Sequence, residues 1–362
     1  MSVVDRSWLV LTDGYLTSRN AKTAHGVIRY GRDRVAAVLD REHAGRSLAD
    51  VMPQLRRDAP IVGSLEEGLS HGPTSLLLGV ATPGGWMPEH WRTWVIESIH
   101  QGMEIANGLH RFLRDDKELV RLARTHRAVL WDVRAVPADI PLFSGRSLAI
   151  PKRIVLTVGS DCAVGKMTVS LELNAAAHAA GFSSQFIATG QTGILIAGGG
   201  IAVDRVIADF VAGAAERLVT ETHPASDVLM VEGQGSLWHP AYSAVTLGLL
   251  HGSAPHALVL CHQVGRTAIE EPPHTSLPSL EEMVRVYERT AATVRPARVA
   301  CVAVNCGTLG EAERKHALAD VEKATGLPTG DVMGGDAPKL WEAVAEALPP
   351  RHQGRDYSVE VT

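Results

Sequence analysis

Residues 158–168 combine residue types and a spacing that suit phosphate binding. They read Val-Gly-Ser-Asp-Cys-Ala-Val-Gly-Lys-Met-Thr, and they lie between an apolar run and an amphipathic segment. A strand, a glycine-rich loop and a helix in that order surround a phosphate with backbone N–H groups, and the lysine adds a positive charge. The sequence therefore predicts a phosphate-binding loop formed by Gly159, Ser160, Asp161, Cys162, Ala163, Val164, Gly165, Lys166, Met167 and Thr168.

Two details of this loop bear on what it binds. Gly159 and Gly165 are separated by one residue more than in the common phosphate-loop motif, and this longer loop resembles that of dethiobiotin synthetase, which activates a carboxylate with ATP. The residue after the lysine usually binds Mg²⁺ through a hydroxyl group, but Met167 has none and Thr168 stands one position later. Thr168 is therefore a metal ligand only if the reaction depends on ATP and Mg²⁺. The structural alternative is a glycine turn with an incidental lysine.

A second motif, at residues 231–237, follows the predicted strand 228–231 and reads Val-Glu-Gly-Gln-Gly-Ser-Leu. A carboxylate at the carboxyl end of a strand beside the phosphate loop is placed to act as an acid or base, or to hold Mg²⁺. We expect Glu232 to be catalytic, or a metal ligand in the ATP-dependent alternative, and Gln234 to lie near the substrate. His239 is the histidine expected at this site. Capping by Glu232 and a core position for His239 are the structural alternatives.

Two further polar segments follow predicted strands. Thr189, Gln191 and Thr192 offer hydroxyl and amide groups without charge, which suit a carboxylate or amide substrate. Asn305, after the strand 300–305, is predicted to contact the cofactor, because in folds similar to dethiobiotin synthetase an asparagine at a similar place reads the adenine edge. The alternative for both segments is an ordinary polar turn.

Composition excludes several classes of protein. Thirty-five Lys and Arg residues against 40 Asp and Glu give a net charge of −5, so a nucleic-acid partner is not expected. The chain has no run of 18 apolar residues, and its first residues lack a basic segment, so neither a signal peptide nor membrane association is expected. Only four cysteines occur, none in a C-x-x-C pair, which is typical of reduced thiols in a cytoplasmic protein.

The order of the predicted elements indicates the α/β class. Alternating strands and helices argue for parallel, doubly wound sheets, and two prolines, Pro137 and Pro141, mark a linker. We therefore expect a Rossmann-like domain at 1–147 and a phosphate-loop NTPase-like domain with a parallel sheet at 148–362. The dinucleotide fingerprint G-x-G-x-x-G is absent from the first domain.

The predicted elements can be given by residue numbers. The strands are expected at 8–12, 34–39, 75–80, 128–133, 153–158, 185–188, 228–231, 257–261 and 300–305. The helices are expected at 20–30, 88–102, 117–126, 166–180, 202–215, 280–294, 309–325 and 339–348.

Several motifs together resemble the domain-of-unknown-function 1611 family. They are residues 159–168, 188–193, 231–237 and 239–243 in the second half, and 21–24, 79–85 and 108–110 in the first. The family pairs a Rossmann-like domain with a phosphate-loop domain, and some members are described as D-glutamate N-acetyltransferases. The resemblance thus implies a transferase of D-amino acid metabolism that uses acetyl-coenzyme A, whose phosphates the loop would hold.

Two functions stay open at this point. In the first, a small amino acid such as D-glutamate is N-acylated with acetyl-coenzyme A, Lys166 and the loop bind phosphate, and Glu232 or His239 removes a proton from the amine. In the second, ATP and Mg²⁺ activate a carboxylate in a ligase or kinase reaction, in which Lys166 is catalytic because it stabilises the transferred charge. A nucleotide-binding regulator without turnover is a third class. The sequence also leaves a homo-oligomer open, because a dimer face and a buried interdomain face show the same apolar pattern.

Overall fold

The computed structural model describes residues 6–82, 85–270 and 275–350. The chain divides into two compact units: unit 1 comprises Met1–Val136 and Gly190–Arg205, and unit 2 comprises Pro137–Thr189 and Val206–Thr362. The expected boundary at 147/148 therefore differs from this division in two ways. Residues 137–147 belong to unit 2, and a segment of the second half returns to unit 1. Pro83 and Gly84, within the quoted stretch 79–85, lie outside the described residues.

Unit 1 is built on a parallel sheet of six strands in the order β3-β2-β1-β4-β5-β6. This is the strand order of Rossmann folds, so the Rossmann-like prediction is confirmed. The strands are β1 (Ser7–Leu11), β2 (Arg34–Leu39), β3 (Ile61–Val62), β4 (Ser75–Leu78), β5 (Glu104–Asn107) and β6 (Val129–Asp132). β1 and β4 are buried along their whole length, as expected for strands that helices cover on both faces.

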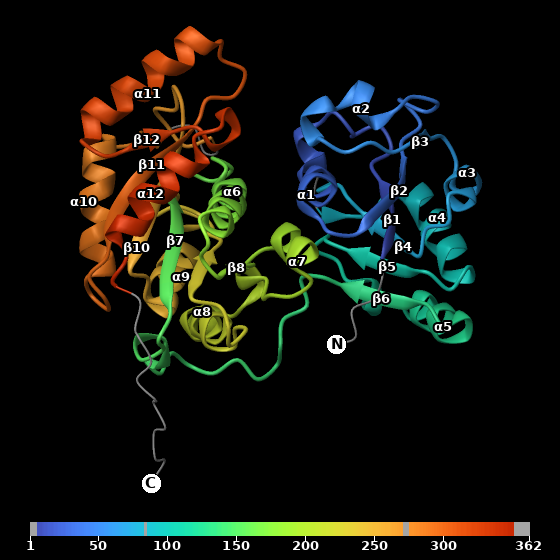
Figure 1. Cartoon of the computed structure of the whole chain (residues 1–362). Helices are drawn as coiled ribbons and strands as arrows, with labels where there is room; N and C mark the ends of the chain where they lie inside the picture. Colours follow the sequence, from blue (N-terminus) through green and yellow to red (C-terminus); the bar gives the residue numbers. More distant parts are fainter. Residues whose placement is uncertain (1–5, 83–84, 271–274, 351–362) are drawn as a thin grey trace. The chain divides into compact units, whose positions relative to one another are not determined.

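The helices of unit 1 flank this sheet (Figure 1). They are α1 (Lys22–Tyr30), α2 (Leu48–Val51), α3 (Leu65–Ser70), α4 (Glu89–His100), α5 (Lys117–His126) and α7 (Gln191–Ala197). α4 and α5 pack against each other, and α7 packs against α1. Local sequence explains several ends: the side chain of Asp116 accepts hydrogen bonds from the backbone of Glu118 and Leu119 and so starts α5.

Unit 2 has its own parallel sheet of six strands, in the order β12-β11-β10-β7-β9-β8. The strands are β7 (Arg153–Gly159), β8 (Ser184–Ile187), β9 (Val228–Val231), β10 (Ala257–Gln263), β11 (Arg298–Asn305) and β12 (Thr329–Gly330). β7 pairs with β9 on one side and β10 on the other. The chain leaves β7 toward one edge and later crosses to the other, so the carboxyl end of β7 is a topological switch point, where such sheets bind ligands.

Six helices cover this second sheet (Figure 1). They are α6 (Lys166–Ala179), α8 (Val211–Thr220), α9 (Ser243–Ser253), α10 (Leu280–Ala291), α11 (Glu311–Thr325) and α12 (Ala337–Ala347). α6 packs against α12, and α9 contacts both α8 and α10. Leu173 of α6 and Leu340 of α12 are fully buried in the same apolar core as Val155 of β7. Within the described parts of the chain, no helix has the length and apolar character that crossing a membrane requires.

One expected helix is wrong and several elements were not expected. Residues 202–215 form two short 3₁₀ turns, Val203–Arg205 and Ala208–Phe210, and only then α8. The chain passes from unit 1 to unit 2 after Arg205, and Val206 and Ile207, between the two turns, are not helical. The unexpected elements are α2, α3, α7, α9, β3, β5 and β12, and most of them are short.

Candidate functional site

The predicted phosphate loop follows β7 and leads into α6. Every residue of β7 is buried, so the loop emerges from the centre of the sheet. Ala163 and Gly165 both have left-handed backbone conformations, with φ of 55° and 103°. Left-handed residues alternating with ordinary ones turn successive N–H groups toward one side, which forms an anion-binding concavity at the start of the helix.

Lys166 is the buried cation of this loop. Its residue is 7% exposed, and its Nζ donates a hydrogen bond to the backbone oxygen of Asp161 at 2.8 Å. Burial lowers the pKa of the Lys166 ammonium, while the nearby Cys162, Asp161 and Glu232 act in the opposite direction. A phosphate in the loop would add negative charge beside this buried ammonium group and further favour its charged form.

The carboxylate of Asp161 fastens the loop rather than facing the ligand. It is fully buried and accepts hydrogen bonds from Nη1 of Arg266 at 2.6 Å, from the backbone of Glu270 at 2.9 Å and from the backbone of Cys162 at 2.6 Å. The ion pair with Arg266 joins the loop to the segment after β10. We therefore assign Asp161 a structural part in holding the loop shape.

Gly159 and Ser160, the two residues before Asp161, are held by residues of three other segments. The hydroxyl of Ser160 lies 2.9 Å from Nδ1 of His262, and its backbone oxygen accepts a hydrogen bond from Ser236 at 3.0 Å. Tyr287, fully buried, donates its hydroxyl hydrogen bond to the backbone oxygen of Gly159 at 2.7 Å. Burial raises the pKa of Tyr287, so the phenol stays protonated and keeps donating.

Glu232 lies just after β9 and is 4% exposed. Its Oε2 accepts a hydrogen bond from the backbone of Thr189 at 2.9 Å, and the Thr189 hydroxyl donates to the backbone oxygen of Glu232 at 2.7 Å. Gln234 donates a hydrogen bond from Nε2 to the same hydroxyl at 3.2 Å. The structure thus brings Glu232, Thr189 and Gln234 together, and Glu232 also interacts electrostatically with Lys166.

Gly233 allows the Glu232 segment to approach the phosphate-loop strand closely. A Cβ at this position would lie 1.8 Å from the backbone oxygen of Thr157 and 3.1 Å from Cδ of Lys166. The backbone N–H of Gly233 also donates to the Thr157 hydroxyl at 2.9 Å. Only a residue without a side chain permits this contact, so the glycine is required by packing.

His239 lies beside the loop as predicted. It is 5% exposed, and its ring packs against Tyr242 with centroids 4.6 Å apart. One ligand atom each from Asp161, Cys162 and His239 lie within 4.8 Å of one another. Both oxygens of Asp161 already accept hydrogen bonds, so this group is a meeting point of polar side chains rather than an open set of metal ligands.

Three other sequence-predicted residues have partners outside the loop. Gln191 and Thr192 begin α7 and belong to unit 1, where Gln191 accepts a hydrogen bond from Arg134 and the hydroxyls of Thr192 and Thr23 lie 3.0 Å apart. The Oδ1 of Asn305 accepts from the backbone of Gly307 at 3.0 Å in a polar turn, and its contact with a cofactor stays a prediction. Met167 and Thr168 occupy the first turn of α6, both half-buried.

Sequence reasoning missed several residues that shape the loop. Arg266, His262 and Tyr287 all contact it, yet they lie about 100 or more positions away along the chain. The one available signal was the position of His262, immediately after the predicted strand 257–261, because polar residues at the carboxyl end of a buried strand often face a site.

Both halves of the chain match the models of known protein families. Residues 41–136 match the DUF1611_N Rossmann-like domain, and residues 141–341 match the DUF1611_C P-loop domain, each described as a domain of unknown function. A crystal structure of a DUF1611 family protein from Anabaena variabilis is 39% identical in sequence, with a TM-score of 0.89, and covers 94% of this chain and 99% of its own.

Two curated relatives carry a functional name. A protein of Tritonibacter scottomollicae named D-glutamate N-acetyltransferase is 39% identical over 283 residues, which is 78% of this chain and 84% of the relative. A Pseudoalteromonas protein of the same name is 39% identical over 274 residues, 75% of this chain and 81% of the relative. The resemblance inferred from the motifs is confirmed: the chain belongs to the DUF1611 family.

Proposed function

We propose that the protein is an N-acyltransferase that moves the acetyl group of acetyl-coenzyme A to the amine of a small amino acid such as D-glutamate. The observation that carries this proposal is the phosphate loop with its buried Lys166, in a chain 39% identical to two relatives named D-glutamate N-acetyltransferase. We assign the loop to the phosphates of the donor, and the names of the relatives suggest the acceptor.

The loop residues fit a phosphate ligand without a metal ion. The left-handed Ala163 and Gly165 turn backbone N–H groups to one side, and Lys166 places an ammonium group within the same loop. Met167 stands where the common motif has the hydroxyl that binds Mg²⁺. Holding coenzyme A phosphates requires anion binding alone, whereas phosphoryl transfer from ATP requires Mg²⁺ as well, so Met167 favours acyl transfer.

The reaction needs a base near the amine. The ammonium group gives a proton to this base, the amine nitrogen bonds to the acetyl carbon, the C–S bond breaks, and the sulfur leaves with the second amine proton as the free thiol. Glu232 and His239 are the two groups we propose for the base, since both are nine-tenths or more buried and both belong to unit 2. Thr189 holds the Glu232 carboxylate in place, and Gln234 in turn donates to the Thr189 hydroxyl.

The test is a product assay with the full chain. We expect N-acetyl-D-glutamate by mass spectrometry and one free thiol per product when D-glutamate and acetyl-coenzyme A are supplied without ATP. Lys166→Ala should weaken acetyl-coenzyme A binding in calorimetric titration, whereas Lys315→Ala, at an exposed lysine paired with Glu311, should leave it unchanged. Glu232→Gln and His239→Gln assign the base, because only the true base variant loses turnover while still binding the donor.

Two results would contradict the proposal. Product that appears only with ATP and Mg²⁺, together with ADP release, would establish carboxylate activation with Thr168 and Glu232 as the metal-binding residues. Nucleotide binding without any product over a panel of D- and L-amino acids would establish a regulator.

A further inference from the structure

Unit 1 has its own topological switch point, between β1 and β4. The sheet order places β2 on one side of β1 and β4 on the other, and open α/β sheets bind ligands outside the carboxyl ends of their strands at such a point. Four side chains meet there: Asp13 follows β1, Arg41 follows β2, and His90 and Trp91 lie in the first turn of α4, the helix after β4. We call these four residues the Asp13 cluster.

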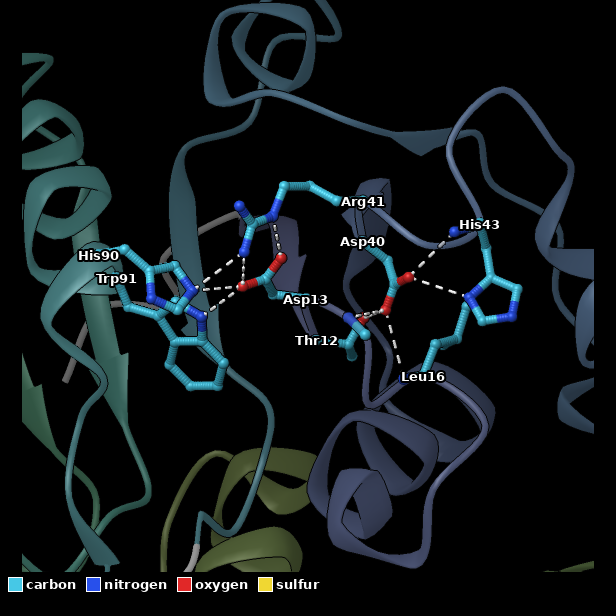
Figure 2. A network of polar contacts seen from close by, with 9 residues as sticks. Thr12, Asp13, Leu16, Asp40, Arg41, His43, His90 and Trp91 are labelled. Atoms are coloured by element: carbon cyan, nitrogen blue, oxygen red, sulfur yellow. Dashed lines mark hydrogen bonds and ion pairs between the residues drawn. The ribbon is translucent and has the colours of Figure 1, made fainter.

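The carboxylate of Asp13 is the centre of the cluster (Figure 2). Its Oδ1 accepts from Nε of Arg41 at 2.6 Å, and its Oδ2 accepts from Nη2 of Arg41 at 2.9 Å, from Nε2 of His90 at 2.6 Å and from Nε1 of Trp91 at 2.8 Å. Burial alone would raise the pKa of Asp13, but the hydrogen bonds from Arg41, Trp91 and His90 hold it below its ordinary value. Asp13 is therefore a buried, ionised group that orients a cation and an imidazole.

The backbone of Asp13 is strained. Its φ is 42°, a left-handed conformation that is uncommon for residues other than glycine. Such conformations persist only where the surrounding structure enforces them, and they concentrate at functional sites. In this conformation the carboxylate of Asp13 points toward α4 and toward Arg41.

Asp40 explains how this conformation is enforced, and why the ligand is not a dinucleotide. Dinucleotide-binding Rossmann folds use an acidic residue after the second strand to hold the ribose. Asp40 follows β2 but is fully buried, and its carboxylate accepts from the hydroxyl of Thr12, from the backbone of Gly14 and Leu16, and from His43 (Figure 2). The Asp40 carboxylate therefore holds the loop after β1, and because it is buried by these contacts it is not available to a ribose.

The outer face of the cluster is open and polar. The side chains of Arg41 and His90 are 56% and 51% exposed, and the ring of Trp94 packs against both, at 5.4 Å and 5.7 Å. Among the described residues, neither Nη1 of Arg41 nor Nδ1 of His90 has a hydrogen-bond partner. A guanidinium edge suits a carboxylate, and an imidazole nitrogen with its proton on the opposite side accepts from an ammonium group.

We propose that the Asp13 cluster is the amino-acid-binding site of unit 1. Arg41 binds the carboxylate of the amino acid, and Nδ1 of His90 accepts a hydrogen bond from one N–H of its ammonium group, with Asp13 fixing the orientation of both side chains. The choice of an amino acid as ligand rests on the proposed function, whereas the site itself rests on the geometry of unit 1.

The experiment titrates D-glutamate, without acetyl donor, into the full chain and its variants by calorimetry. Arg41→Gln and His90→Gln should each weaken binding roughly tenfold or more, the loss expected when a charged hydrogen bond is removed. Arg92→Gln is the matched control, because Arg92 lies two residues after His90 on α4 and pairs with Asp116 and Glu118 instead. In steady-state assays the first two variants should raise KM for D-glutamate and leave KM for acetyl-coenzyme A unchanged.

Asp13→Asn is a control that separates a loss of D-glutamate binding from a loss of folding. Asparagine tolerates the left-handed conformation and keeps the shape of the side chain, so this variant should fold, as circular dichroism will show, and still bind D-glutamate weakly. If the wild type acetylates D-glutamate and the Arg41 and His90 variants bind it normally, the inference is overturned while the proposed function stands. If the wild type binds D-glutamate through these residues but acetylates nothing, the site stands and the proposed function fails. If the wild type does not bind D-glutamate, the inference is overturned as well.

Discussion

Arg134, just after β6, donates a hydrogen bond from Nη1 to Oε1 of Gln191, the first residue of α7, at 2.9 Å. The same guanidinium pairs with Asp204. Arg134 is only 4% exposed, so its two contacts are made inside unit 1. These contacts hold residues 190–205, which belong to unit 1 although they lie within the phosphate-loop half of the sequence. We call this segment the 190–205 excursion. One buried arginine therefore fixes both ends of the 190–205 excursion.

Replacing this arginine should loosen the excursion. In Arg134→Met the side-chain volume is largely kept, but Gln191 and Asp204 lose their donor. We expect the docking of 190–205 to weaken by about 1.5–3 kcal/mol, the range for hydrogen bonds to a charged group, and the amides of α7 to exchange faster by about tenfold or more in hydrogen–deuterium exchange. Arg205→Met is the control, because Arg205 is exposed and packs over Phe112. Equal protection of α7 in wild type and Arg134→Met would contradict this account.

The excursion also shows what sequence alone could not provide. The sequence predicts Thr189, Gln191 and Thr192 as substrate-binding residues, because uncharged hydroxyl and amide groups suit a carboxylate or amide substrate. The unit boundary falls between Thr189 and Gly190, so the motif is divided. α7 has seven residues and ends at Gly198, and nothing within so short a stretch indicates that its partner is Arg134, 57 positions earlier.

The phosphate loop was predictable for the opposite reason. Its strand, glycines, Lys166 and helix are contiguous, so the local pattern alone specifies the shape, and Glu232 follows a buried strand of the same sheet. Residues that act from a distance escaped prediction. Arg266 and Tyr287 stabilise the loop through single contacts, and an isolated arginine or tyrosine carries no sequence signal of such a contact.

Gly233 provides a test of the close packing behind the loop. In Gly233→Ala the added Cβ would meet the backbone oxygen of Thr157 at 1.8 Å. Relieving this clash requires the backbone itself to move, which costs free energy. We expect a loss of about 3 kcal/mol or more in the free energy of unfolding of unit 2, measured by urea titration, and weaker phosphate binding. Gly199→Ala is the control, since a Cβ there would meet nothing within 4 Å. A Gly233→Ala protein as stable as the control would show that the two segments can separate without cost.

Asp40 should make unit 1 sensitive to acid. Burial alone would raise the pKa of Asp40, but hydrogen bonds from His43, Thr12 and Gly14 lower it overall. A carboxyl with a lowered folded pKa contributes stability above its unfolded pKa of about 3.9 and loses it as the pH falls through the folded value. Asp40→Asn should therefore cost roughly 1.5–3 kcal/mol at neutral pH and flatten the acid limb below about pH 4. Urea unfolding from pH 2.5 to 7 measures the loss at neutral pH and the slope of the acid limb. Asp320→Asn, at an exposed carboxylate, is the control. Parallel acid limbs in Asp40→Asn and wild type would show that Asp40 does not cause the acid sensitivity.

His262 should act in a different pH window, because it is an imidazole kept neutral by burial. Burial, and then the neighbouring Arg266, lower the pKa of His262 to about 4, and its Nδ1 lies 2.9 Å from the Ser160 hydroxyl in the phosphate loop. The unfolded chain binds a proton near pH 6.5 and the folded chain does not, so stability is complete above about 6.5 and declines as the pH falls toward 4. The decline should amount to roughly 2–3 kcal/mol.

His262→Gln tests this dependence directly. Glutamine cannot be protonated in this range but can still hydrogen-bond to Ser160, so the part of the decline between pH 6.5 and 4 that His262 causes should disappear in urea unfolding of the full chain. His316→Gln provides the comparison, since the His316 side chain is 82% exposed and its removal should leave the wild-type profile in place. Phosphate or acetyl-coenzyme A binding measured over the same pH range separates a local from a global effect. If ligand binding to the loop shows the wild-type pH dependence in both variants, the protonation of His262 does not control the loop.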